Sequence, residues 1–454
     1  MMDDTIAAIA TPLGEGGLAV IRVSGPDALR VADKCFTPAG TRHRKASEAA
    51  SHTIHYGHIT HGGRTVDEAL MAVMHRPRTF TREDVVEFTC HGGLLAAKLV
   101  LAAVLESGAR LALPGEFTQR AFLNGRIDLA QAEAVADLIH ARTELALAAA
   151  NEQLAGKLSQ RINRLRDDLL RVLAHVEAHI DFPDEDIAPD TRGQLAQRLT
   201  DGLAFMDDLL RTAGDGQILR RGVRAAIIGR PNAGKSSLLN QLLGRDRAIV
   251  SAIAGTTRDT IEETAGVRGI PVVFVDTAGL REAGDEIELE GIRRSHAALE
   301  RAELILHVLD ASEPLTDNDQ RYLEQFAGRK RILVLNKCDR PRRLESSFTE
   351  RTVEVSCLTG AGLEALKDAI RDLVWSGGIH AEMLEVMINA RHQEALARAR
   401  QATERTGAAL RNGEPLDLVA VDLRIAVNAV GEIVGKTTTE DLLDSIFSQF
   451  CLGK

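Results

Sequence analysis

Several features that mark particular classes of protein are scarce or missing in this sequence. Five cysteines occur in 454 residues and no two have CxxC spacing, so we expect a reducing compartment and no disulfide framework. No run of about 18 apolar residues occurs, which argues against a membrane-spanning helix. The acidic start, Met-Met-Asp-Asp-Thr, leads into no long apolar stretch. A secretory signal is therefore not expected, and the sequence predicts a cytoplasmic protein.

An excess of basic charge is also missing. The chain has 55 Lys and Arg against 65 Asp and Glu, a formal net charge of −10. This balance argues against a general nucleic-acid coat, because neutralising phosphates requires clustered cations, but it is compatible with a local basic patch. The 44% hydrophobic and 26% charged residues are typical of globular proteins, and the length has room for roughly two to four domains.

Proline is absent from residues 127–180, which contain a single glycine, Gly156, among many strong helix formers. We expect long helices of a bundle there. Before this stretch, apolar runs at 18–23 and 85–90 predict strands, each followed by a helical pattern, as in a mixed α/β domain. After it, helical spacing resumes at 194–210 and leads through a glycine-containing hinge at 213–216 into the next domain.

Apolar strands and helices alternate from residue 222 to about 376, which predicts a doubly wound, mainly parallel sheet. Helices return afterwards, so the simplest organisation inserts this domain between two halves of one helical domain. The predicted fold is therefore multidomain, α/β and α. Its predicted boundaries are an N-terminal α/β domain at 1–120, the first helical half at 121–216, the inserted domain at 217–378 and the second helical half at 379–454.

The inserted domain begins with a phosphate-binding pattern. Residues 229–236, Gly-Arg-Pro-Asn-Ala-Gly-Lys-Ser, fit G-x-x-x-x-G-K-[ST] and stand between an apolar strand and a helix. This arrangement points backbone N–H groups and a helix N-terminus at an anion. Lys235 would reach the outer phosphates of a nucleotide, and the Ser236 hydroxyl would ligate Mg²⁺.

Four further motifs follow in the order that a GTPase requires. Asp276-Thr-Ala-Gly would contact Mg²⁺ through water and the γ-phosphate, and Thr257 would contact both. Asp339, in Asn336-Lys-Cys-Asp, can accept hydrogen bonds from N1–H and the 2-amino group of guanine, which adenine lacks, so GTP is favoured over ATP. Ser356-Cys-Leu would supply an N–H to the guanine O6. The predicted GTP contacts are Asn232, Ala233, Gly234, Lys235, Ser236, Ser237, Ser251, Ala252, Ile253, Ala254, Gly255, Thr256, Thr257, Asp276, Thr277, Ala278, Gly279, Asn336, Lys337, Asp339, Ser356, Cys357 and Leu358.

One position departs from Ras-like GTPases. Leu280 follows Asp-Thr-Ala-Gly, where a Ras-like protein has the glutamine that orients the attacking water. Leucine cannot orient water, so another group must do so, and no arginine finger is evident.

Taken together, the chain resembles the MnmE (TrmE) family of tRNA-modifying GTPases almost from end to end. The matching stretches, besides the nucleotide motifs, are Ala10-Thr-Pro-Leu-Gly-Glu-Gly-Gly, Pro114-Gly-Glu-Phe-Thr-Gln-Arg-Ala-Phe-Leu-Asn-Gly, Leu129-Ala-Gln-Ala-Glu-Ala and the tail Cys451-Leu-Gly-Lys. The resemblance implies a Ras-like P-loop GTPase domain inserted in a helical bundle domain, and an N-terminal domain with a tetrahydrofolate-binding-like fold.

The resemblance also implies a cation-dependent mechanism. Family members form homodimers through the N-terminal domain, and their GTPase domains meet across K⁺, which replaces an arginine finger. The implied K⁺ ligands are Asn232, Ser251, Ile253 and Thr256, and the implied Mg²⁺ ligands are Ser236 and Thr257. Glu288 would orient the water, although the acidic run around it also fits a solvated loop.

For the N-terminal domain, the resemblance implies that a tetrahydrofolate derivative, 5-formyl or 5,10-methylene, supplies a one-carbon unit. The implied folate-binding residues are Arg22, Glu87, Arg126 and Lys454, and Cys451 would take part in catalysis. From the strand pattern we expect Arg22 and Glu87 to point inward, where burial penalises polar groups unless a ligand satisfies them. Without the resemblance, ordinary surface pairing and a structural cysteine are the simpler interpretations.

The resulting hypothesis is a K⁺-activated GTPase that modifies tRNA. With an FAD-containing MnmG-type partner, in a heterotetramer, it would add a carboxymethylaminomethyl or aminomethyl group to C5 of the wobble uridine of certain tRNAs. The alternative is a regulatory ribosome-assembly GTPase of the Era/Der type, which predicts a basic KH-like tail with a GXXG loop. A folate enzyme with a vestigial nucleotide domain is a third possibility, and it conflicts with the intact Asn336-Lys-Cys-Asp motif.

Overall fold

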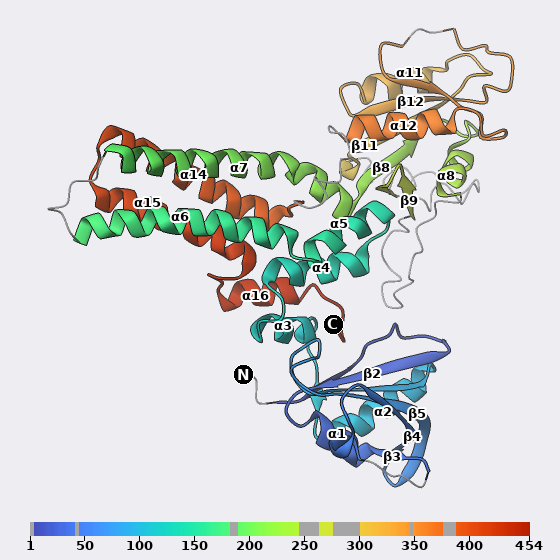
Figure 1. Ribbon diagram of the computed structural model, residues 1–454. Coiled ribbons are helices and arrows are strands. Elements are labelled where there is room, and N and C mark those ends of the chain that lie inside the picture. Colours follow the sequence, from blue (N-terminus) through green and yellow to red (C-terminus); the bar gives the residue numbers. More distant parts are fainter. Residues whose placement is uncertain are drawn as a thin grey trace.

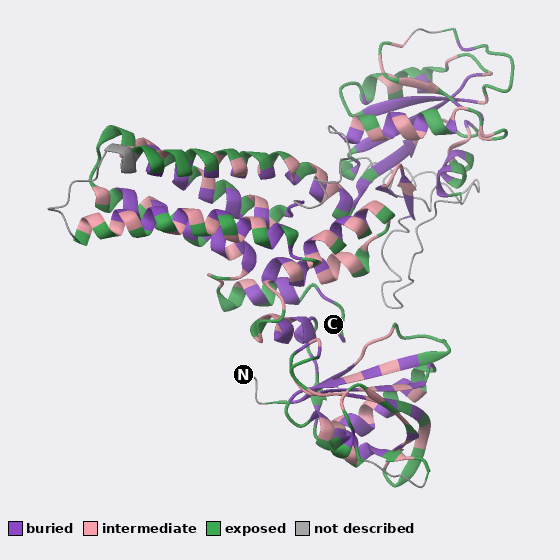
Figure 2. Cartoon of the chain, viewed as in Figure 1, coloured by how far each residue is buried: buried purple, intermediate pink, exposed green. Residues whose placement is uncertain are grey.

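The computed structural model describes residues 4–40, 45–181, 189–244, 263–275, 300–345, 348–375 and 387–454, without the side chains of 189–192. Within these ranges an elongated helical domain lies between two sheet domains (Figure 1). The predicted fold class is confirmed. Buried residues follow the central strands and the inner sides of the long helices (Figure 2). In these ranges, no helix has the length and apolar character needed to cross a membrane.

The N-terminal domain is built on a sheet with the strand order β3-β4-β5-β6-β2-β1-β7. Its strands are β1 (Ile6–Ile9), β2 (Leu18–Ser24), β3 (Phe36–Pro38), β4 (Thr53–His61), β5 (Arg64–Met74), β6 (Val85–His91) and β7 (Arg110–Leu111). All neighbouring pairs are antiparallel except β1 and β7. Two helices, α1 (Ala28–Cys35) and α2 (Leu94–Glu106), and the short turn η1 (Ala46–Glu48) complete the domain.

Helices α1 and α2 cover one face of this sheet, because alternate strand residues on that face are apolar. Ile21, Met71 and Phe88 from three neighbouring strands are 0% exposed and pack in one core with Val31 and Val100 of the helices. The strands at 18–23 and 85–90 were predicted, whereas the β4–β5 hairpin was not.

The other face of the sheet carries a row of residues paired in register: Ala8, Arg22, Glu87 and Ala72. The prediction that Arg22 and Glu87 point inward is wrong, because the residues that alternate with them fill the helix-covered core. Their side chains are 19% and 28% exposed, and Arg22 Nε lies 2.7 Å from Glu87 Oε1. The cross-strand pair therefore satisfies both charges without a ligand.

The helical domain is a bundle whose core is shared by both halves of the chain. Its helices are α3 (Glu116–Leu123), α4 (Leu129–His140), α5 (Glu144–Leu154), α6 (Lys157–Asp181), α7 (Pro189–Arg221), α14 (Ala390–Asn412), α15 (Leu416–Val434) and α16 (Glu440–Phe447). Leu165, Leu209, Leu396 and Leu423, one from each of the four long helices, belong to one buried cluster. Neither half can bury this apolar face alone.

Helix α7 departs from the prediction at its C-terminal end. The glycine-containing stretch 213–216 is not a hinge but part of the continuous helix, which runs to Arg221. A Cβ at Gly216 would lie 2.5 Å from the Ile388 carbonyl oxygen, whereas one at Gly214 would meet nothing within 4 Å. Gly216 therefore allows close packing between the two halves of the domain, and this packing outweighs the low helix propensity of glycine.

The inserted domain has the strand order β13-β12-β11-β8-β10-β9, with parallel pairs throughout except β9 and β10. Its strands are β8 (Val223–Ile228), β9 (Glu263–Val267), β10 (Ile270–Phe274), β11 (Leu304–Asp310), β12 (Arg331–Asn336) and β13 (Thr352–Glu354). Its described helices are α8 (Lys235–Leu243), α11 (Asp317–Gln325) and α12 (Leu363–Val374). The predicted doubly wound, mainly parallel sheet is confirmed.

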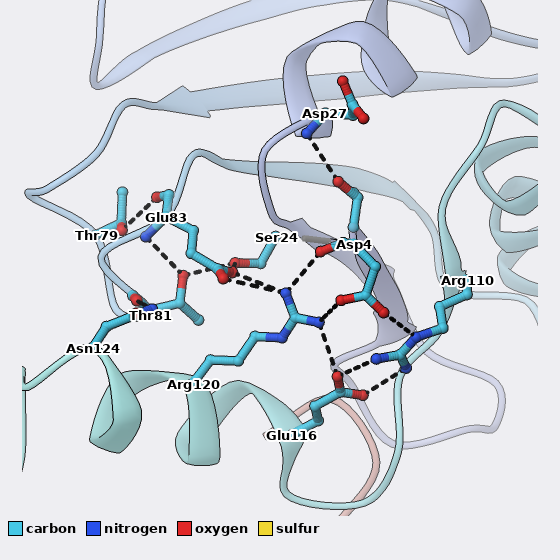
Figure 3. Close-up of polar contacts among 11 residues, drawn as sticks. Asp4, Ser24, Asp27, Thr79, Thr81, Glu83, Arg110, Glu116, Arg120 and Asn124 are labelled. Carbon is cyan, nitrogen blue, oxygen red and sulfur yellow. Dashed lines mark hydrogen bonds and ion pairs between the residues drawn. The ribbon is translucent and has the colours of Figure 1, made fainter. Parts of the chain in front are cut away.

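A buried ion cluster joins α3 to the N-terminal sheet (Figure 3). Arg120, 1% exposed, lies 2.7 Å from Asp4, 2.9 Å from Glu116 and 3.2 Å from Glu83. Arg110 also binds Glu116, at 2.5 Å. Burial alone would raise the pKa of Glu116, but hydrogen bonds from Arg110, the Leu113 N–H and Arg120 outweigh it and lower that pKa. Glu116 and Arg120, both in the stretch that begins at Pro114, thus attach α3 to the N-terminal sheet.

Candidate functional site

The phosphate loop connects β8 to α8. Gly229 and Gly234 have φ angles of 145° and 100°, a region that L side chains rarely adopt. A Cβ at Gly229 would collide with the Val308 carbonyl oxygen, and one at Gly234 with the Asn336 side chain. Both glycines are therefore required by the close approach of neighbouring strands as well as by the turn itself.

The loop leaves the first turn of α8 open. Asn232, Ser236 and Ser237 are exposed, whereas Ala233 is 0% exposed and anchors the loop in the domain core. Asn232 adopts a φ of 63°, which asparagine tolerates better than most residues. Lys235 Nζ donates to the Arg230 carbonyl at 2.9 Å, and burial lowers its pKa. The loop thus places a lysine at the N-terminus of α8, an arrangement that is suited to phosphate groups.

Asn336, the last residue of β12, ties the phosphate loop to the loop after β13. Its Nδ2 donates to the Ala233 carbonyl at 2.8 Å, and its Oδ1 accepts from the Cys357 N–H at 3.2 Å. Gln241 of α8 donates to the Cys357 carbonyl at 2.8 Å. Three segments far apart in sequence therefore meet at the carboxyl edge of the parallel strands, where ligands bind in open α/β sheets.

Asp339 is held in place by Ser356. The Ser356 Oγ donates to Asp339 Oδ1 at 2.6 Å, and this hydrogen bond is the main cause of the lowered pKa of Asp339. The carboxylate stays ionised at neutral pH, and the residue is exposed. Leu358, 83% exposed, follows in the same loop. An ionised acceptor fixed by a neighbour suits recognition of adjacent N–H donors.

The structure brings together one part of the predicted nucleotide site. Residues 232–237, 336, 337, 339 and 356–358 lie on these connected loops. The other predicted residues fall outside the described ranges: Ser251, Ala252, Ile253, Ala254, Gly255, Thr256, Thr257, Asp276, Thr277, Ala278, Gly279 and Glu288, together with Leu280. Strands β9 and β10 lie between these two undescribed stretches along the chain.

The C-terminal tail contacts the Arg22–Glu87 pair. Arg22 Nη1 donates to the Gly453 carbonyl at 3.1 Å, across 431 positions of sequence. Burial and the nearby Arg22 lower the pKa of Lys454, and Glu87 opposes the shift. Three of the four predicted folate residues, Arg22, Glu87 and Lys454, are therefore neighbours on the sheet face away from α1 and α2.

The remaining residues of that group lie nearby. Arg126 Nη1 donates to the Thr79 carbonyl at 2.8 Å, and its guanidinium is 5.4 Å from the centre of the Phe80 ring. Phe80 packs on the cluster that contains Phe117, whose ring lies 5.7 Å from the Arg22 guanidinium. Cys451 is exposed, and its carbonyl accepts from the Gly115 N–H at 3.4 Å.

Two polar side chains at the nucleotide loops were not predicted. Asp310 ends β11 and binds Lys337 Nζ at 2.6 Å, and the Arg230 side chain lies 2.6 Å from Glu313. The signal for Asp310 is its place directly after an apolar strand, at the same sheet edge as the motifs. Arg230 occupies a variable position of the phosphate-loop pattern, so the pattern could not identify it.

Comparison with known proteins covers almost the whole chain. The MnmE helical domain family matches residues 129–451, and the GTP-binding protein TrmE N-terminus family matches residues 5–126. A protein of Geobacillus kaustophilus named tRNA modification GTPase MnmE is 48% identical over 461 residues, covering 99% of each chain. Proteins with the same name from Bacillus velezensis and Listeria welshimeri are 46% and 47% identical, covering 99% of this chain and 100% and 99% of theirs.

Proposed function

The chain belongs to the MnmE family of tRNA modification GTPases, and on that premise we propose its reaction. It hydrolyses GTP in a K⁺-activated manner. With an FAD-containing MnmG-type partner, it adds a carboxymethylaminomethyl or aminomethyl group to C5 of the wobble uridine of certain tRNAs, using a tetrahydrofolate one-carbon unit. We place this activity in the cytoplasm.

The observation that carries the nucleotide part is the bridge between the two loops. Asn336 binds both the Ala233 carbonyl and the Cys357 N–H, so the loop that suits phosphates and the loop that suits a base have a fixed spacing. Ser356 holds Asp339 ionised and oriented. A carboxylate so placed accepts from the N1–H and 2-amino groups of guanine, and an adenine base offers neither donor.

The ions have suitable ligands in the described part of the loop. The Asn232 amide oxygen and the Ser236 hydroxyl are hard oxygen donors on the exposed side of the loop, as K⁺ and Mg²⁺ require. Ser251, Ile253 and Thr256 would complete the K⁺ ligands, and Thr257 those of Mg²⁺. Bound ions would supply positive charge next to the phosphates of GTP, and Glu288 would orient the attacking water.

The folate proposal rests on the chemistry of the residues around the tail. Arg22 and Lys454 are cations that suit the carboxylates of a folate, and Glu87 is an acceptor that suits the N–H groups of its pterin ring. Arg126, whose guanidinium lies over the Phe80 ring, offers a further cation. Cys451 lies in the same tail and stays a catalytic prediction.

The partners follow from charge and from the family. Because this chain is acidic, a partner protein would supply part of the basic surface that binds the phosphates of tRNA. We therefore propose a homodimer that joins the MnmG-type protein in a heterotetramer. The Era/Der alternative is disfavoured, because residues 390–447 form α14, α15 and α16 of the helical domain rather than a KH-like module.

The test of this function is the nucleoside composition of tRNA from cells that lack the protein. We expect unmodified wobble uridines there, and restoration by a plasmid copy of the wild-type chain. Fully modified wobble uridines in the deletion strain would refute the modification role. That result would not affect the proposal that the protein hydrolyses GTP.

The cation requirement is tested separately on purified protein. We expect GTP turnover to be much faster in KCl than in NaCl at equal ionic strength, because a charge beside the transferred phosphoryl group lowers the barrier. Matched nucleotide affinity in the two salts is the control. Equal turnover rates would exclude a specific K⁺ site.

A further inference from the structure

Asp310 is a buried carboxylate between the two loops of the nucleotide site. Its side chain is 3% exposed, and its Oδ2 lies 2.6 Å from the ammonium of Lys337. Oδ1 accepts from both the N–H and the hydroxyl of Ser312, at 2.9 and 2.7 Å. Both carboxylate oxygens are therefore bound, and the orientation of the group is fixed.

The same carboxylate faces the phosphate loop. The Arg230 guanidinium lies 4.0 Å from Asp310 and is held by Glu313 at 2.6 Å. The carbonyl of Arg230 accepts from Lys235 at 2.9 Å. Asp310 therefore stands between the cation of the base-binding loop and a cation of the phosphate loop.

Lys337 is constrained at both ends. Its backbone has a φ of 67°, which is unfavourable for a residue other than glycine and must be held by the surrounding structure. Its ammonium is held by Asp310 at 2.6 Å, so the far end of the side chain is fixed as well. Immobilising a lysine side chain costs conformational entropy, and here that loss has already occurred before a ligand binds.

We propose that Asp310 is a positioning residue of the nucleotide site, which fixes Lys337 in the conformation that receives the guanine base. This inference rests on the proposed binding of guanine nucleotides. Asp310 itself does not touch the nucleotide. Its effect on affinity passes through Lys337, and the bonds of Asn336 and Asp339 do not depend on it.

The test is a double-mutant cycle read by fluorescent GDP binding to the full chain. Asp310→Asn removes the charge that holds the ammonium, and we expect affinity to fall about tenfold, the usual scale of a charge-assisted hydrogen bond. Lys337→Ala should weaken binding by at least as much. In a chain that already carries Lys337→Ala, Asp310→Asn should not change the GDP affinity further, because Asp310 acts through the Lys337 side chain, which is absent there.

Matched controls separate positioning from general damage. Asp372→Asn removes a carboxylate of α12 that binds Arg351 at 2.8 Å, in the same domain, and we expect unchanged GDP affinity. Asp310→Asn should weaken GDP and IDP binding by the same factor, because the 2-amino group is read by Asp339. A change in the GDP-to-IDP ratio would contradict the assignment.

The outcomes distinguish this inference from the function on which it rests. If the wild-type chain fails to bind GDP, the guanine-nucleotide proposal fails first. If the wild type binds GDP and Asp310→Asn binds it equally well, the positioning role is refuted. The role is also refuted if Asp310→Asn lowers the GDP affinity of Lys337→Ala by the same factor as it lowers that of the wild type. Should Asp310→Asn not fold, Asp310→Glu keeps the charge but displaces it by one methylene. It is expected to weaken binding only where Lys337 is present.

Discussion

At the scale of single residues, Asp339, which we propose to recognise the base, is held in place by a neighbouring side chain. The Ser356 hydroxyl fixes one carboxylate oxygen at 2.6 Å, and the side chain is exposed. The hydrogen bond from Ser356 keeps the Asp339 carboxylate ionised and oriented. We therefore expect the loss of either its charge or its orientation to lower the affinity for guanine nucleotides.

Asp339→Asn is expected to weaken GTP binding by about ten- to a hundredfold, because one acceptor of the pair becomes an amide donor that meets a guanine N–H. Xanthosine triphosphate carries a carbonyl in place of the 2-amino group, so its affinity should rise in the same variant. Competition of both nucleotides against fluorescent GDP measures the two changes. Unchanged preference for GTP would contradict guanine recognition by Asp339.

His307 is a second residue with a pronounced electrostatic environment. It is 0% exposed within β11, and neither ring nitrogen has a hydrogen-bond partner. Burial and the nearby Arg331 lower its pKa to about 4, while Asp319 and Glu350 oppose the shift. The ring is therefore neutral in the folded chain.

This predicts a loss of stability in acid. An unfolded histidine titrates near pH 6.5 and the folded one near 4, so the unfolded state binds more protons between these values. The neutral ring therefore contributes to the free energy of unfolding above pH 6.5. This contribution is lost as the pH falls to 4 and amounts to roughly 3 kcal/mol. His307→Phe should make unfolding of the inserted domain less dependent on pH in this window. Equal pH dependence of denaturant midpoints in both proteins would contradict it.

At the scale of elements, regular apolar patterns were enough to predict β2, β6 and the helices that follow them, as well as the alternating strands and helices of the inserted domain. The β4–β5 hairpin was missed because its strands alternate apolar residues with histidine, threonine and charged residues, whose signal is weaker. The hinge at 213–216 was wrong because local glycine propensity competes with packing that only the folded chain contains. Motifs identified Asp339 and Lys235, but Asp310 belongs to no motif and is recognised only from its contacts.

Two glycines of α7 give a matched test of this packing argument. Gly216→Ala places a methyl group 2.5 Å from the Ile388 carbonyl oxygen, and we expect it to destabilise the helical domain by about 1–3 kcal/mol. Gly214→Ala meets nothing within 4 Å and should stabilise the helix by about 0.5–1 kcal/mol. Urea unfolding followed by circular dichroism measures both. A stabilising Gly216→Ala would show that α7 does not pack on residue 388 as described.

At the scale of the whole molecule, the turn between α4 and α5 and the start of α5 form the contact between the helical domain and the inserted domain. Arg142 donates to Thr264 of β9 at 2.6 Å, and Leu145 packs against Gly269 of the β9–β10 turn. On its other side, α4 binds α14 through Glu133 and Arg391, at 2.8 Å. Residues 133–145 therefore contact β9 and the β9–β10 turn as well as the second half of the bundle.

The tail provides a second long-range contact, and Gly453 is required for it. Its φ is 87°, and a Cβ there would lie 2.7 Å from the Ile9 carbonyl oxygen. We expect Gly453→Ala to release the tail from the sheet, so that carboxypeptidase removes the last residues severalfold faster. Gly413→Ala, with φ of 69° and nothing within 4 Å, is the control and should leave the tail protected. An unchanged rate of trimming in Gly453→Ala would exclude the tail contact.

The 431 positions between Arg22 and Gly453 also set an order of events during protein synthesis. At about 5–20 residues per second, the ribosome makes Gly453 roughly 20–90 s after Arg22. The N-terminal sheet and the inserted domain can each fold in that interval, because the contacts within them are complete earlier. The Arg22–tail contact forms last, so a ribosome that stops early releases a chain with its phosphate loop intact but without the tail that contacts Arg22.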